Sequence, residues 1–316
     1  MNPTLFFLLF PLGRRWLCRD LAGLGLLLAP LAGRAQYKVQ VVTRTVTRAL
    51  PCPASALVRI RAEKATVRIQ GWDQPTARLV LKLSARHPER AVAESELPAA
   101  RYQFDRHGNT LDLVNFYAVA ATAGVVRSDL RAGYTLWVPA GVRLELRNLY
   151  GQTYLSDLTG EQKIEQDFGQ ITLANLRGSF RATARYADLT AANTAGIFAC
   201  EAEKSAVRLL GMAGRCTVRN RYGSVMLEAT AELKSAFLDV ERTDVTLSVP
   251  QPELFNFNLA SAQGSLLVPP RYETAQRTAG GRSTLQLTNG PALALIRVST
   301  SYAAITLQTT ALNLVC

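Results

Sequence analysis

The stretch that decides the fold runs from residue 151 to residue 222 and divides into GQTYLSDLTGEQKIEQDF, GQITLANLRGSFRATARY, ADLTAANTAGIFACEAEK and SAVRLLGMAGRCTVRNRY. Each of these segments has eighteen residues, opens on a small residue and has a glycine nine places later. Two series of small residues therefore advance in steps of eighteen. They are Gly151, Gly169, Ala187, Ser205 and Gly223, and Gly160, Gly178, Gly196 and Gly214. A fixed period of this length is typical of proteins built from stacked structural repeats.

Each half of the repeat has the pattern of a short strand. Two apolar residues flank one residue that is mostly polar, an alternation that indicates a strand with one buried face. With looser spacing the pattern recurs after Thr243, Gly264, Ser283 and Ala303, which makes nine copies. The expected inward pairs of these copies are Thr153/Leu155, Ile171/Leu173, Leu189/Ala191, Val207/Leu209, Val225/Leu227, Val245/Leu247, Leu266/Val268, Leu285/Leu287 and Ile305/Leu307. The second glycine series opens strands with the inward pairs Gln162/Ile164, Phe180/Ala182, Phe198/Cys200 and Cys216/Val218.

One such unit cannot bury its own apolar face. Units stacked in register at about 4.8 Å would form two parallel sheets around a shared core. Glycine suits the corners between the sheets, where positive φ or close backbone approach is required. The sequence therefore predicts an all-β protein, a single β-solenoid with about 18–20 residues per coil.

Stacking would also align exposed side chains in columns. Just before the small residue stands an aromatic residue in five of the nine copies: Tyr150, Phe168, Tyr186, Tyr222 and Tyr302. We interpret this column as a structural aromatic stack that seals one corner; an exposed platform for sugar rings is the alternative. One position earlier, Asp167, Arg185, Glu203 and Arg221 alternate in sign, which predicts ion pairs between neighbouring coils.

The chain before the repeats is less regular. Strands are expected over 57–70, 77–84, 101–105, 110–116 and 134–138, with a loop over 118–129. Long helical patterns are missing throughout. We expect residues 36–145 to form an N-terminal β region, as first coils or as a cap, and residues 146–316 to form the repeats.

Residues 1–35 have the character of a signal peptide. Arginines precede an apolar run over residues 21–32, and the small residues Gly33 and Ala35 predict cleavage after Ala35. The run is too short for a bilayer-spanning helix of roughly 20 residues, although an uncleaved anchor remains the alternative. The protein is therefore expected to be exported, to the periplasm or the surface of a bacterium. Cleavage would remove four arginines and one aspartate, which lowers the net charge from +12 to +9.

No reaction centre emerges from the sequence. His87 and His107 lie in turn-like contexts, and neither a zinc-type cysteine pair nor a phosphate-binding loop is present. Cys200 and Cys216 are expected to be small buried hydrophobes, whereas the pairing of Cys52 and Cys316 is open. We expect no catalytic, cofactor or metal site. A carbohydrate-active enzyme, which would need clustered carboxylates on an outer face, is the less favoured alternative.

Several segments resemble a bacterial adhesin-like domain of unknown function, a family of exported proteins with repeated short β units. The segments are residues 65–73 (ATVRIQGWD), residues 138–142 with the entry into the repeats at 146–160, and residues 302–307 (YAAITL). Ala187, Ser205 and Ala303 stand where the family usually has glycine. The resemblance covers residues 57–310 and implies an adhesin-like architecture, with no catalytic residue to transfer.

Together these patterns predict a non-catalytic cell-envelope scaffold or interaction module. A glycan- or lipid-binding protein that uses a basic surface is the alternative. Acidic glycans, anionic envelope lipids or another envelope protein are the candidate partners. Nucleic acid is not expected, because the basic residues are dispersed along the chain.

Overall fold

The computed structural model describes residues 39–118 and 125–309, which belong to one compact unit starting at Lys38. Of the described residues, 72% are in strands of one mixed, largely parallel sheet. The signal-peptide prediction and Cys316 lie outside the described residues.

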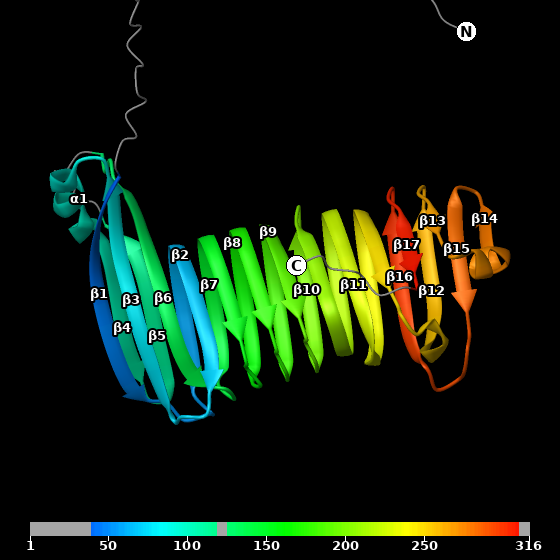
Figure 1. Cartoon of the computed structure of the whole chain (residues 1–316), viewed down its shortest axis with the longest axis horizontal. Helices are drawn as coiled ribbons and strands as arrows, with labels where there is room; N and C mark the ends of the chain where they lie inside the picture. The colour runs from blue at the N-terminus through cyan, green and yellow to red at the C-terminus, as the bar shows by residue number, and fades with distance from the viewer. Residues whose placement is uncertain (1–38, 119–124, 310–316) are drawn as a thin grey trace, which may run out of the picture. The chain divides into compact units, whose positions relative to one another are not determined.

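Seventeen strands, one α-helix and three 3-10 helices make up the described chain (Figure 1). The strands before the repeats are β1 (Gln40–Pro51), β2 (Leu57–Trp72), β3 (Thr76–His87), β4 (Ala100–His107), β5 (Thr110–Tyr117) and β6 (Asp129–Pro139). Those of the regular repeats are β7 (Arg143–Ser156), β8 (Glu161–Ala174), β9 (Ser179–Ala192), β10 (Ile197–Glu203) and β11 (Ala206–Ser248). The last strands are β12 (Phe255–Ala262), β13 (Leu266–Leu267), β14 (Gln276–Ala279), β15 (Arg282–Leu287), β16 (Ala294–Ser301) and β17 (Ile305–Gln308). The helices are α1 (Arg90–Glu96), η1 (Leu97–Ala99), η2 (Pro252–Leu254) and η3 (Pro270–Ala275).

The pairing register reproduces the eighteen-residue period. Gly151 of β7 pairs with Gly169 of β8, and Gly169 pairs with Ala187 of β9, always in parallel. β9 continues in the same register to β10 and β11. β2 joins this series from a distance in sequence, because its residues Leu57–Gln70 pair with the matching positions of β7.

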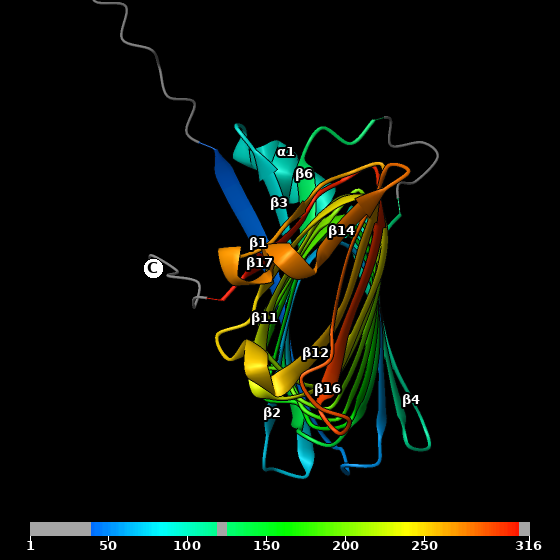
Figure 2. The ribbon, with the colours of Figure 1, turned by 90° about the vertical axis from the view of Figure 1, so that its right-hand side faces the viewer.

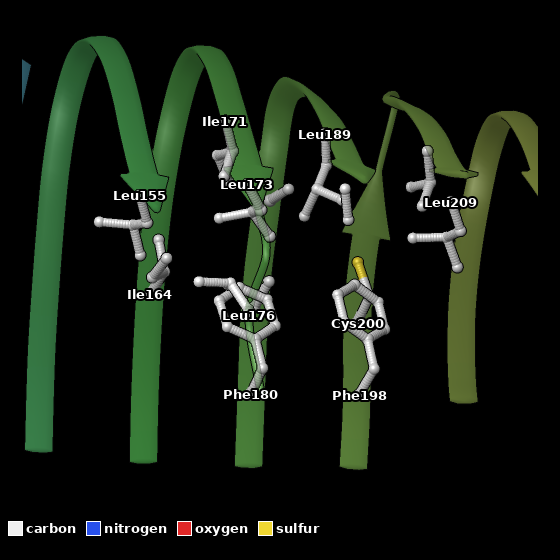
Figure 3. Close-up of a cluster of buried hydrophobic side chains, with 14 of the residues drawn as sticks. Leu155, Ile164, Ile171, Leu173, Leu176, Phe180, Leu189, Phe198, Cys200 and Leu209 are labelled. Atoms are coloured by element: carbon white, nitrogen blue, oxygen red, sulfur yellow. The ribbon is translucent and has the colours of Figure 1, made fainter. Parts of the chain in front are cut away.

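The apolar residues of both strand halves form a continuous core. Figure 3 shows the ribbons arching over between strand halves, with Leu155, Ile164 and Ile171 on the inner side. The Phe180 and Phe198 rings of adjacent repeats stack in this core with centroids 5.2 Å apart. Of the predicted inward residues, Val268 and Leu287 are half-buried and the others are buried. Full burial of one such aliphatic side chain stabilises the fold by about 1.5–3 kcal/mol.

At the N-terminal end, the strands other than β2 pair antiparallel with one another, and β5 and β6 also pair in parallel with β2. β3 pairs antiparallel with both β1 and β6, and β4 pairs antiparallel with β5. The five strands expected in this region are present and are longer than expected. β1 and the seven-residue helix α1 were not predicted. The residues of α1 make too few turns to produce a helical pattern in the sequence.

At the C-terminal end the strands do not follow sequence order. β16 lies between β11 and β12, with Ile296 paired to both Ala236 and Phe257. β17 lies between β11 and β13, with Ile305 paired to both Val245 and Leu266. Figure 1 shows these two red strands between the yellow and the orange ones. We call β16 and β17 together the inserted segment.

The insertion changes two of the nine predicted copies. The Ser283 copy is not a parallel repeat, since β15 pairs antiparallel with β12 and with β14. The Ala303 copy, last in sequence, is an interior strand rather than a terminal one. Seen along the row of strands (Figure 2), the strand halves lie behind one another in two layers.

Candidate functional site

In β2 and in every repeat copy except the one at Ser283, one corner is formed by a single residue in the left-handed region. Tyr150, Phe168 and Tyr186 have φ values of 63°, 59° and 53°. The same conformation recurs at Lys64, Lys204, Tyr222, Arg242, Gln263 and Tyr302. The residue that follows needs to be small: a Cβ at Gly151 would collide with the carbonyl oxygen of Ala65, and one at Gly169 with that of Gly151. We call these nine positive-φ residues the corner column.

The five predicted aromatic residues lie in the corner column, and three of them stack on one another. The Phe168 ring stacks on Tyr150 at 4.9 Å and on Tyr186 at 5.2 Å between centroids. The Lys204 ammonium lies over the Tyr186 ring and donates a hydrogen bond of 3.0 Å to its hydroxyl oxygen. The Arg242 guanidinium lies 5.5 Å from the Tyr222 centroid and 5.6 Å from the Tyr302 centroid. For Phe168, whose two faces are covered, the contacts fit the structural interpretation better than the sugar platform, because stacking on a sugar requires a free ring face.

Buried polar side chains hold the corners from inside, a feature that the sequence reasoning missed. Thr153 donates to Gln166 Oε1 at 2.6 Å, and Gln166 Nε2 donates to the Gly151 carbonyl at 2.8 Å. Asn148 donates to the Ala65 carbonyl at 3.1 Å, and Asn220 donates to that of Ser205 at 3.0 Å. The available signal was a polar residue at a core position two places before the corner.

The face that precedes the corner column carries the predicted alternating charges. Arg185 bonds to Asp167 of the previous repeat at 2.5 Å, and this carboxylate raises the pKa of the guanidinium. Arg221 pairs instead with Glu241 of the next repeat, at 3.4 Å. Arg219 lies 3.5 Å from Glu201. Exposed pairs of this kind contribute at most about 1 kcal/mol each, so they set register more than stability.

A hollow interrupts this face over the inserted segment. Its floor consists of Ser299 and Ser301 of β16 and Ala260 and Ala262 of β12, and its volume is about 490 Å³. Its walls carry larger charged side chains, which are Arg219, Arg221, Asp239 and Glu241 of β11 and Arg282 of β15.

A second hollow of about 320 Å³ adjoins the first and shares Asp239 and Ser299 with it. Phe237 and Arg297 complete its lining on the surface. We call the two hollows together the groove. Sequence reasoning did not find it, because residues of β11 and β16 some sixty positions apart become neighbours through the insertion.

The other residues weighed for chemistry do not converge on a site. His107 lies 3.9 Å from Asp112, and His87 accepts a hydrogen bond from the Glu89 amide. In residues 39–118 and 125–309, no group of three or more His, Cys, Asp and Glu side chains is arranged to hold a metal ion. Nor does this part of the chain contain a helix long and apolar enough to cross a membrane.

The described cysteines are buried thiols. Within the described residues, Cys52, Cys200 and Cys216 form no disulfide, in line with the small-hydrophobe interpretation of the last two. Burial raises the pKa of Cys200 to about 12, and it raises the pKa of Cys216 as well.

Comparisons with known proteins find likeness at the level of structure. No family model matches the sequence, and no curated protein matches it. A putative cell adhesion protein from Clostridium sporogenes is similar at 10% identity and a TM-score of 0.26, over 86% of this chain and 99% of that one. A putative adhesin from Bacteroides fragilis is similar at 9% identity and a TM-score of 0.29, over 84% and 97%. A putative lipid binding protein from Parabacteroides distasonis is similar at 9% identity and a TM-score of 0.25, over 85% and 95%. These similarities are distant, and no sequence family matches the chain.

Proposed function

We propose that the chain is an exported, non-catalytic β-solenoid that serves as an adhesin-like interaction module of the cell envelope. Three observations support a chain that winds into a solenoid: the eighteen-residue pairing register, the positive-φ corners and the core shared between strand halves. In such a solenoid each of β7, β8 and β9 would be one coil, bent at its corner residue.

The observation that carries the function is the regular exposure of side chains along a finite, rigid row of strands. Two of the free sheet edges, those of β1 and β14, are blunted against further pairing. β1 ends at Pro51 and turns Arg44 across to the Ala100 carbonyl at 2.7 Å, where the guanidinium also lies over Tyr102. At the other end, β14 has four residues and is flanked by η3. A row of strands whose edges resist further pairing would present a defined surface to a partner.

One observation favours the enzyme alternative. Asp239 and Glu241 lie two residues apart on β11 and line the same hollow, at a spacing of about 6.6 Å expected along a strand. Both carboxylates stand on one wall, and Glu241 is paired with Arg221, whereas a glycosidase places its two carboxyl groups on either side of the bond that breaks. We therefore favour binding over hydrolysis.

The proposal is tested by purified residues 36–316 on glycan and lipid arrays at two salt concentrations. We expect specific binding that survives the higher salt, and no release of reducing sugar from a bound glycan. Absence of binding to glycans, to lipids and to envelope extracts would contradict an interaction module. Hydrolysis that Asp239→Asn abolishes would establish the enzyme instead.

Export has a separate test. In a bacterial host, the secreted or periplasmic protein should begin at Gln36 when its N-terminus is sequenced. A full-length chain retained in the cytoplasm would contradict the proposed localisation. It would not affect the binding proposal, which the arrays test separately.

A further inference from the structure

The groove exists because the inserted segment brings small outward side chains to a surface that elsewhere carries large ones. Asp239 of β11 stands beside Ser299 of β16, and Ala260 of β12 stands beyond Ser299. Arg282 of β15 pairs in register with Ala262 and closes the far side. Neighbouring strands lie about 4.8 Å apart, so the trough between β11 and β15 is about 14 Å wide.

Phe237 gives the groove an apolar surface with an unused ring. It is 41% exposed, and among residues 39–118 and 125–309 no other ring and no cation lies over it. This distinguishes it from Phe168, whose two faces are covered by Tyr150 and Tyr186. A flat, partly hydrated ring beside polar groups suits a ligand with one apolar face, such as the C–H face of a sugar ring.

The charged groups of the groove favour an anionic ligand. Four arginines and two carboxylates line it. Arg219 and Arg221 already pair with Glu201 and Glu241. Arg282 and Arg297 have no ion-pair partner within the described part of the chain, and a guanidinium binds a carboxylate through two parallel hydrogen bonds.

Hydroxyl recognition is available in the same place. Asp239 can accept hydrogen bonds from sugar hydroxyls, and Ser299 can donate and accept. Both side chains are exposed and line both hollows. The volumes of about 490 and 320 Å³ lie in the range of about 300–1,000 Å³ that is usual for small-molecule sites.

We propose that the groove over the inserted segment binds a carboxylated glycan, with one sugar ring on Phe237 and carboxylates of the glycan on Arg297 and, farther along the groove, on Arg282. This inference rests on the proposed function as an interaction module and specifies its ligand class. The Asp239 carboxylate gives the site a preference for polyhydroxylated ligands over simple anions, because it repels an anion that offers no hydroxyl in return.

The test measures binding of oligogalacturonate to residues 36–316 by calorimetry, with a neutral oligosaccharide of the same length as the comparison. Arg297→Gln is paired with Arg181→Gln, an exposed arginine at the same strand position several repeats away and outside the groove. Phe237→Ala is paired with Ile197→Ala, which removes an apolar side chain that is 56% exposed on the same face. Circular dichroism confirms that each variant is folded.

We expect Arg297→Gln and Phe237→Ala each to weaken oligogalacturonate binding about tenfold, the equivalent of one good contact, and the two control variants to change it less than about twofold. Equal losses for Arg297→Gln and Arg181→Gln would show diffuse charge attraction and overturn the groove, while the interaction module would stand. A protein that binds anionic phosphatidylglycerol vesicles but not oligogalacturonate, with vesicle binding unaffected by Phe237→Ala, would also overturn the glycan proposal. Its ligand would then be a lipid surface. Absence of any ligand on the arrays and in calorimetry would contradict both proposals.

Discussion

Ile296→Ala tests whether the C-terminal segment is an interior part of the sheet. Ile296 is fully buried and is paired to Ala236 on one side and Phe257 on the other. Truncation of a buried isoleucine to alanine removes three carbons from the core and costs about 2–5 kcal/mol. The matched control is Ile197→Ala, at a position 56% exposed, where we expect a change within about 0.5 kcal/mol.

The assay is urea unfolding of residues 36–316, followed by circular dichroism. In an interior strand, Ile296→Ala removes packing contacts with both neighbouring strands. The urea midpoint of the main unfolding transition should therefore shift to a lower concentration. A terminal repeat would fray by itself, leaving the main transition in place. A loss for Ile296→Ala no greater than that for Ile197→Ala would refute the reasoning.

Cysteine cross-linking checks the strand order that this prediction assumes. Thr306 pairs with Thr246 on one side and with Leu267 on the other. Thr246→Cys and Thr306→Cys should form a disulfide, because neighbouring strands place the Cα atoms about 4.8 Å apart. Thr246→Cys and Leu267→Cys, separated by β17 and about 9.6 Å apart, should not. Cross-linking of the second pair would show instead that the strands stack in the order of the sequence, with β13 next to β11.

Three further predictions concern the corner and the core. Gly169→Ala should lower the free energy of unfolding by about 2 kcal/mol or more, because φ is +123° and the added Cβ would meet the Gly151 carbonyl. Gly108→Ala, at a positive-φ site with open space, should lower it by about 1 kcal/mol. Equal losses for the two variants would contradict the close approach at Gly169. Gln166→Leu should cost about 1–3 kcal/mol in urea unfolding by leaving its buried partners unpaired, and a neutral effect would show that the corner network is dispensable. Cys200, with a pKa of about 12, and Cys216 should resist a thiol reagent at pH about 8 and react in urea; fast labelling of the native protein would contradict their burial.

The repeat could be predicted because its signal is local. A small residue at the corner and a buried pair after it reflect constraints within one eighteen-residue unit, and Ile171 with Leu173 or Val207 with Leu209 show the pattern directly. The order of the last strands could not be predicted, because the copies after Thr243, Gly264 and Ala303 satisfy the same pattern wherever they stack. The sequence therefore places Ile305 in a core without saying between which neighbours.

The groove was hidden for the same reason. Phe237 and Arg297 are sixty residues apart, and only the pairing of β11 with β16 makes them neighbours. Conversely, the five aromatic residues of the corner column were evident in the sequence, and three of their rings, those of Tyr150, Phe168 and Tyr186, stack on one another. β1 escaped prediction because the exposed Arg44 shares a strand face with the half-buried Val42 and Val46, which breaks the apolar alternation of the strand.

The central claim, that each repeat folds back on itself as one coil of a solenoid, is tested most directly by a distance within β9. Spin labels at Ser179→Cys and Ala192→Cys, in a Cys316→Ser background of residues 36–316, mark the two ends of this strand. A coil bent at Tyr186 brings the two backbones within about 10 Å, the separation of packed layers, and the labels within about 25 Å. A straight strand of the same residues would separate them by about 43 Å. A short electron–electron distance is the result that we expect, and a distance near the extended value would contradict the solenoid.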